Sequence, residues 1–142
     1  MDEASITHYI TDTFADVEIA NNFGYTFFFY STDHTLPFAT LISADYEYDR
    51  VSNLDRPGIF RLNIGVGKQT FQTLFGTTHI DTAHYDYTAL NTIMPHPEYA
   101  PQSFVCVLNP TGATLQTVQQ LLAEAYEIAV RRYQRRKARP KS

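Results

Sequence analysis

Apolar side chains at the start of the chain recur with the period of an amphipathic helix. They follow one another at intervals of three and four residues, as one face of a helix requires: Ile6, Tyr9, Ile10, Phe14 and Val17. Asp2 stands where its carboxylate is able to cap the first turn. The pattern predicts an opening helix, and Asn21, Asn22 and Gly24 predict a turn after it.

Three segments that follow favour β-strands. The aromatic and β-branched residues from Tyr25 to Tyr30 suit a strand and resist a helix. Residues 38–44 predict a second strand, which forms a hairpin with the first. In residues 60–66, apolar side chains alternate with Arg61, Asn63 and Gly65, a pattern typical of a half-buried strand. One face of the resulting sheet must therefore be covered by other elements.

The second half of the chain predicts two more helices and one more strand. Residues 68–75 have helical spacing and Gly76 ends the helix, whereas residues 77–101 form an irregular segment with a helical turn near 88–94. Residues 104–108 are apolar throughout, which predicts a central strand. Thr114 caps a final helix with a broad apolar stripe. Helix, strands, helix, strand and helix, in this order, predict an α+β fold.

Composition indicates one folded domain. The 142 residues are 44% hydrophobic and 18% charged, and they include ten Phe and ten Tyr, so the chain has enough apolar side chains for a core. The one cysteine, Cys106, lies in the apolar strand, and we expect it to be a small core residue. No apolar run approaches the roughly 20 residues that cross a bilayer, and the first residues are acidic. We therefore expect a cytoplasmic protein without membrane contacts.

Charge separates the chain into two parts. All fifteen acidic residues and four of the basic ones precede residue 131, and the remaining seven basic residues follow. We expect one α+β domain over residues 1–130 and a basic helix end and tail over 131–142. Such a tail is able to hold nucleic acid through its phosphates. It also offsets the helix macrodipole and pairs with the acidic domain, and we favour this second interpretation.

Histidines and carboxylates gather in the irregular segment. His79, His84 and His96 lie among Asp81 and Asp86, and these are side chains that bind transition metals. Their spacing matches no metal motif, so we expect solvated or turn-forming roles and neither a metal nor a cofactor. The alternative is a small enzyme, with or without a bound metal, in which Asp86 orients His84 or His96 for acid–base chemistry.

Arg61 and Asn63 point to the face of their strand opposite its apolar residues. A guanidinium and an amide there are suited to an anionic or amide-bearing ligand. Because the domain is acidic, we expect an acidic residue of the chain itself to be the main partner of Arg61. The aromatic residues of 25–30 lack neighbouring cations, so we interpret Phe27 and Phe29, or Phe28 and its neighbours, as core residues rather than a base-stacking surface.

Three strings of residues resemble a known family: residues 55–66, residues 95–99 (Pro-His-Pro-Glu-Tyr) and residues 105–110. They are similar to an uncharacterised bacterial family known only as a domain of unknown function (number 6194). More distantly, the last strand and helix resemble those of the MmcQ/YjbR-like proteins. That resemblance implies a single compact domain, with a mainly antiparallel sheet flanked by N-terminal and C-terminal helices.

The function predicted from these observations is a non-catalytic binding or accessory domain. Its ligand is a small polar molecule or a protein partner, held between the strand of Arg61 and the segment from His84 to Tyr99. The candidate ligand-binding residues share polarity and position in these two segments: Arg61, Asn63, His84, Asp86, His96 and Tyr99. The small enzyme and the nucleic-acid-binding tail remain the alternatives.

Overall fold

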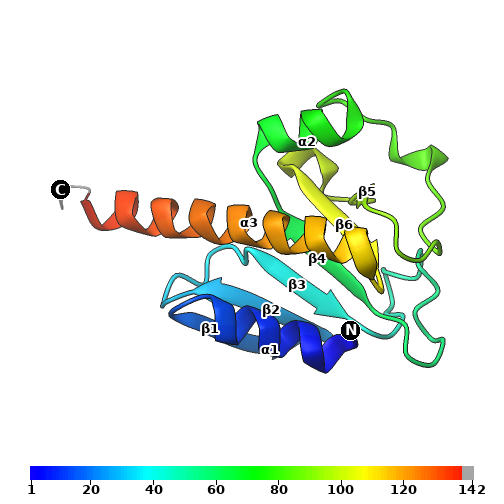
Figure 1. The fold of residues 1–142 in the computed structure, drawn as a ribbon, viewed down its shortest axis with the longest axis horizontal. Helices are drawn as coiled ribbons and strands as arrows, with labels where there is room; N and C mark the ends of the chain where they lie inside the picture. The colour runs from blue at the N-terminus through cyan, green and yellow to red at the C-terminus, as the bar shows by residue number, and fades with distance from the viewer. Residues whose placement is uncertain (139–142) are drawn as a thin grey trace.

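One six-stranded sheet organises the protein (Figure 1), whose computed structural model describes residues 1–138. Its strands are β1 (Val17–Asn22), β2 (Tyr25–Tyr30), β3 (Ala39–Ile42), β4 (Arg61–Gly65), β5 (Met94–Pro95) and β6 (Phe104–Leu108). The order across the sheet is β1-β2-β3-β4-β6-β5, and every neighbouring pair is antiparallel. The α-helices are α1 (Glu3–Thr13), α2 (Lys68–Phe75) and α3 (Gly112–Ala138). Short 3-10 helices cover Thr82–His84 (η1) and Ala100–Gln102 (η2).

Helices α1 and α3 pack on one face of the sheet, which we call the helix face (Figure 1). The buried residues of this layer are apolar side chains that alternate along the strands and recur along the helices: Ile6, Ile10, Phe28, Leu41, Leu62, Ile64, Val105, Val107, Val118 and Leu122. Alternation places every second strand residue here. The predicted single α+β domain, an antiparallel sheet with N-terminal and C-terminal helices, is confirmed.

The opposite face, the loop face, is covered by irregular chain instead of helices. A second apolar cluster joins Ile42, Cys106 and Leu108 of the sheet to Leu54 and Tyr87 of the two long connections. These connections are residues 43–60 and 76–93, and they cover the end of the sheet where β4 begins. The remainder of the loop face, over β2 and β3, is left without such a cover, and the candidate site described below lies there.

Turn chemistry sets several element boundaries. β1 and β2 are joined by Phe23 and Gly24, both of which have positive φ, as a tight two-residue hairpin turn requires. Gly76 ends α2 in the left-handed conformation and donates its N–H to the carbonyl of Gln72. Asp2 accepts a hydrogen bond of 2.8 Å from the backbone N–H of Ser5 and so caps α1. The predicted strand 25–30 and the helix 68–75 with its Gly76 end are confirmed, whereas Asn21 and Asn22, predicted as turn residues, belong to β1.

Three details of the predicted elements are wrong, although the first and last helices themselves form. The opening helix ends at Thr13, because Asp16 takes a positive φ and the chain then forms β1, so Val17 belongs to a strand. No helical turn forms over 88–94, where the chain instead bends into the two-residue strand β5. The last helix begins at Gly112, and Thr114 lies in its first turn with its hydroxyl donating to Asn91.

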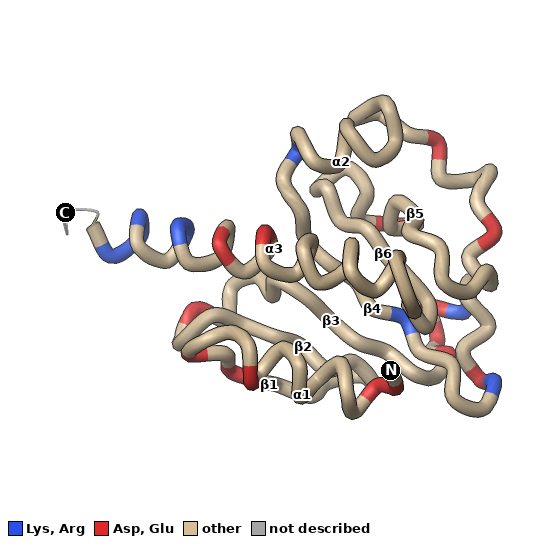
Figure 2. Tube along the Cα trace, in the orientation of Figure 1, with Lys and Arg blue, Asp and Glu red and all other residues tan. Residues whose placement is uncertain are grey.

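The far end of α3 carries the basic residues and extends past the sheet (Figures 1 and 2). Arg136 donates to Asp33 at 2.7 Å and to Thr35 at 2.9 Å, and the ring of Tyr133 packs edge-on against Tyr30. The predicted pairing of this end with the acidic domain is therefore confirmed for Arg136. The predicted tail residues 139–142 lie outside the described residues. Within residues 1–138, no helix combines the length and the apolar character that spanning a bilayer demands.

The buried face of α1 predicts a large stability cost on truncation. Ile10 is fully buried in the helix-face layer, so Ile10→Ala should lower the free energy of unfolding by about 2–5 kcal/mol, because it leaves a cavity. Urea denaturation monitored by circular dichroism measures this loss. The exposed neighbour Thr11 gives the control, and Thr11→Ala should change stability by less than about 1 kcal/mol. Equal effects of the two substitutions would contradict the packing of α1.

Candidate functional site

The buried polar side chains of the domain gather on the loop face. Five are buried within residues 1–138: Thr40, Ser52, Arg61, Asn63 and His96. Thr40 faces Asn63 across the β3–β4 pair, Cys106 lies opposite Asn63 on β6, and His96 directly follows β5. Burying polar groups costs free energy unless they find partners, so their concentration here marks the part of the fold that needs a specific explanation.

Arg61 forms the centre of a hydrogen-bonded network. Its side chain is fully buried and binds both carboxylate oxygens of Asp49, with the Nη1 to Oδ1 distance at 2.9 Å. Nη1 also donates to the hydroxyl of Ser52 at 3.1 Å. Because Asp49 and Ser52 belong to the connection 43–60, this network fastens that connection to the sheet. The predicted interpretation of Arg61, an internal acidic partner, is the arrangement observed.

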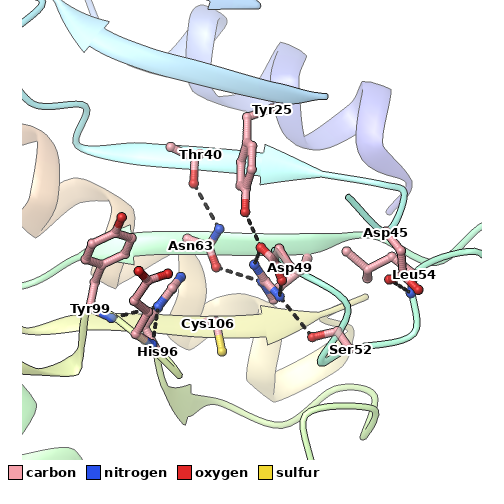
Figure 3. A network of polar contacts seen from close by, with 12 residues as sticks. Tyr25, Thr40, Asp45, Asp49, Ser52, Leu54, Asn63, His96, Tyr99 and Cys106 are labelled. Atoms are coloured by element: carbon pink, nitrogen blue, oxygen red, sulfur yellow. Dashed lines mark hydrogen bonds and ion pairs between the residues drawn. The ribbon is translucent and has the colours of Figure 1, made fainter. Parts of the chain in front are cut away.

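The network continues across the strands (Figure 3). Arg61 Nε donates to Asn63 Oδ1 at 3.1 Å, and Asn63 Nδ2 donates to Thr40 Oγ1 at 2.9 Å. The hydroxyl of Tyr25 on β2 donates to Asp49. Each bond fixes the orientation of the next side chain, so the amide of Asn63 has a defined direction.

Electrostatics follow from this geometry. Burial alone would raise the pKa of Asp49, but the hydrogen bonds and the charge of Arg61 outweigh burial and hold that pKa below its ordinary value. Burial favours a lower pKa for Arg61, but the carboxylate of Asp49 raises it. Burial raises the pKa of the Tyr25 hydroxyl, and it raises that of the Cys106 thiol to about 12. The network therefore contains one permanent, mutually neutralised ion pair.

His96 is held by the turn that follows it. Its Nδ1 accepts hydrogen bonds from the backbone N–H groups of Glu98 at 3.0 Å and Tyr99 at 2.9 Å. A nitrogen that accepts two N–H groups carries no proton, so the neutral ring has its hydrogen on Nε2. Burial, together with the nearby charge of Arg61, lowers the pKa of His96 to about 3. The imidazole is therefore a fixed hydrogen-bond donor at neutral pH.

A groove of about 510 Å³ opens beside this network. Thr40 and Asn63 of the sheet and His96 line it together with aromatic side chains, among them Tyr25, Phe27 and Tyr99. Phe104 is another wall residue, and its ring lies over Gly65, where a Cβ would come within 2.9 Å of the ring. His96 Nε2 makes no hydrogen bond within residues 1–138. Every fully buried polar side-chain atom of these residues has a partner, so Nε2 is not fully buried. Because His96 lines the groove, Nε2 lies at the groove surface.

Another hollow of similar size is a weaker candidate. It measures about 550 Å³ and lies between the first residues of α1 and the segment 54–60. It is more open to solvent than the groove, and none of the five buried polar side chains lines it. Convergent polar groups in an apolar hollow characterise ligand sites, which favours the groove.

The candidate residues predicted from sequence divide into two sets. Asn63, His96 and Tyr99 line the groove, and Arg61 supports Asn63 from below. His84 and Asp86 do not line it. The His84 side chain is 82% exposed and lies 3.3 Å from Asp81, whereas the exposed Asp86 accepts hydrogen bonds from Thr88. Within residues 1–138, no three histidine, cysteine or carboxylate side chains are grouped to hold a metal.

Sequence reasoning missed several groove residues. Phe27 was one of the aromatic residues expected in the core, and Tyr25 was given no role. Alternation along β2 turns both to the loop face, whereas Phe28 lies in the helix-face core. Neither Thr40 nor Phe104 belongs to a residue type or a motif that indicates a ligand site. Alternation along the predicted strand 38–44 could have indicated Thr40, because this residue pairs with Asn63 and shares its face of the sheet.

Removing the charge of Asp49 should be costly. Asp49→Asn keeps the shape but leaves the buried Arg61 without its counter-charge, so we expect a loss of about 3 kcal/mol or more in unfolding free energy. Chemical denaturation gives the value. Asp86→Asn, at an exposed carboxylate, is the matched control and should change stability by less than about 1 kcal/mol. If the two variants were equally stable, the role given to the Arg61 and Asp49 pair would be wrong.

The depressed pKa of His96 predicts a pH dependence of stability. The ordinary pKa of histidine is 6.5, and that of His96 in the folded protein is about 3. At a pH between these two values, the unfolded chain binds a proton at His96 and the folded chain does not. Stability from this source is therefore complete above pH 6.5 and decreases as the pH falls, by up to about 1.4 kcal/mol per pH unit.

His96→Asn separates this effect from the other titrating groups. The Oδ1 of asparagine is able to replace Nδ1 as the acceptor of the two backbone N–H groups but does not titrate. Urea denaturation at several pH values should give a shallower loss of stability for the variant. Parallel curves for the two proteins would show that His96 protonates normally in the folded state.

Comparisons with known proteins agree with the fold and assign no activity. A crystal structure of a protein from Pseudomonas syringae has a TM-score of 0.57 and 14% sequence identity, and the match covers 91% of this chain and 99% of that chain. At this identity the likeness concerns the fold alone. No curated protein matches the sequence. The model of a family of unknown function, DUF6194, matches residues 1–138, and the chain therefore belongs to that family.

Proposed function

We propose that this protein is a non-catalytic binding domain whose site is the groove on the loop face. The observation that carries the proposal is His96. Its ring is buried and held by two backbone N–H groups, yet its Nε2–H meets the groove without a partner from residues 1–138. An accessible donor on a buried ring, at the surface of a largely apolar hollow, supports recognition of a ligand that carries a hydrogen-bond acceptor.

The chemistry of the groove supports binding rather than catalysis. A general acid or base needs a pKa near the working pH, whereas that of His96 is about 3. The thiol of Cys106 stays protonated because burial raises its pKa to about 12. Asp49 is occupied by Arg61 and Tyr25. These groups are suited to holding and orienting a molecule.

The ligand site that we propose differs from the one expected from the sequence. It keeps Asn63, His96 and Tyr99, gives Arg61 a supporting role, and leaves out His84 and Asp86 because they do not line the groove. The expected polar ligand becomes one with an apolar body and a polar acceptor, since aromatic and aliphatic side chains together form most of the wall.

Other expectations stay predictions. They are a cytoplasmic location, a bacterial source, a protein partner, the small enzyme, and the distant relationship to MmcQ/YjbR-like proteins. Nucleic-acid binding by residues 131–142 also stays a prediction, although Arg136 is already paired with Asp33. The pairing supports the structural interpretation of the basic helix end.

A thermal-shift screen tests the proposal. A library of small amines, amides, esters and nucleosides should contain molecules that raise the melting temperature, because a ligand of the native state stabilises it by mass action. For such a ligand, His96→Asn should lower the affinity about tenfold, the effect of losing one hydrogen bond of about 1.4 kcal/mol. His84→Asn, at an exposed site, serves as the control. Ligands whose affinity depends on neither His96 nor Tyr99 would place the binding site elsewhere.

A further inference from the structure

Aromatic rings surround the groove on two sides. Phe23, Tyr25 and Phe27 come from the β1–β2 hairpin, and Tyr99 and Phe104 come from the turn before β6 and its first residue. Tyr25 and Phe27 stack at 5.8 Å between ring centroids, and Tyr99 and Phe104 meet at 6.3 Å. Phe23 and Tyr99 are 63% and 49% exposed, large values for aromatic side chains. A molecule in the groove therefore meets aromatic surface from both walls.

The charged groups at the groove have one sign. Glu98 is the one charged residue in its lining, and within residues 1–138 its carboxylate makes no ion pair. Arg61 lies beneath the floor, but its side chain is fully buried and bound to Asp49. No lysine or arginine of residues 1–138 is among the lining residues, and many of the lysines and arginines lie along the far end of α3 (Figure 2). The electrostatic potential in the groove therefore favours a positively charged ligand.

Building on the proposed groove site, we infer that its ligand is a small organic cation, an alkylated ammonium that also carries an acceptor oxygen. Aromatic faces attract such a cation through their quadrupoles, most strongly when water is excluded. The carboxylate of Glu98 adds a direct electrostatic attraction. The oxygen of the ligand accepts the Nε2–H of His96. These three contacts come from different segments, so together they define the size and polarity of the ligand.

The same features disfavour an anionic ligand. A carboxylate or phosphate in the groove would meet Glu98, and no lysine or arginine of residues 1–138 is in the lining to oppose it, while the guanidinium of Arg61 already has its counter-charge. The acidic character of residues 1–130 acts in the same direction. A neutral ligand would satisfy His96 but would use neither Glu98 nor the cation attraction of the rings.

Matched probes test the inference. Acetylcholine carries a quaternary ammonium and an ester oxygen, and 3,3-dimethylbutyl acetate has the same shape without the charge. NMR titration of the full chain should show that acetylcholine binds at least about fivefold more tightly and shifts the resonances of Tyr25, Asn63 and Tyr99. Glu98→Gln should weaken acetylcholine by about fivefold and leave the neutral ester unchanged. Glu127→Gln, an equal change of net charge at an exposed position on α3, should affect neither probe.

The outcomes separate this inference from the proposed function. If the neutral ester binds as tightly as the cation and both depend on His96, the groove is a binding site but the cation inference is overturned. If acetylcholine does not bind in the groove, the inference also fails, and the broader screen decides on the groove. If acetylcholine binds but shifts resonances away from the groove, without effect of His96→Asn or Tyr99→Leu, the inference is overturned, and the broader screen again decides on the proposed function.

Discussion

The loop face depends on one ion pair, that between the fully buried Arg61 and Asp49. A guanidinium without contact with water is tolerated only when a counter-charge and further hydrogen-bond partners surround it. Asp49 supplies the charge, and Ser52 and Asn63 supply further oxygens. Because Asp49 and Ser52 stand in a connection without regular structure, the pair also determines how that connection lies on the sheet.

The groove inherits its properties from this arrangement. Tyr25 is oriented by its bond to Asp49, and Asn63 by its bonds to Arg61 and Thr40. Arg61 also helps to keep His96 neutral, which reserves its Nε2–H for a ligand. The positive charge of the network is used internally, so the groove shows a donor, aromatic rings and the carboxylate of Glu98. A site with these groups is organised before a ligand arrives, which lowers the ordering cost of binding.

Local patterns in the sequence predict what depends on neighbours along the chain. The strand Tyr25–Tyr30, the helix ended by Gly76 and the buried Cys106 are examples. Failures occur where a local pattern is ambiguous. Phe14 and Val17 fit a helical spacing, but a positive φ at Asp16 ends that continuity, and the resulting edge strand was missed.

Long-range contacts explain the rest of what was missed. An acidic partner for Arg61 could be expected from the charge of the domain, but choosing Asp49 among fifteen acidic residues requires the path of the connection 43–60. His96 was a candidate from its residue type alone. Its state depends on the turn through Glu98 and Tyr99 and on burial beside β6, and neither is visible in residue spacing.

The central claim is that His96 is a neutral, fixed donor in the groove. Long-range ¹H–¹⁵N NMR of the histidine rings measures this most directly, with the His96 signals assigned by their loss in His96→Asn. At about pH 5, where an ordinary histidine with a pKa near 6.5 is protonated, the account predicts a neutral His96 ring with its hydrogen on Nε2. A protonated ring, or a neutral ring with its hydrogen on Nδ1, would contradict it.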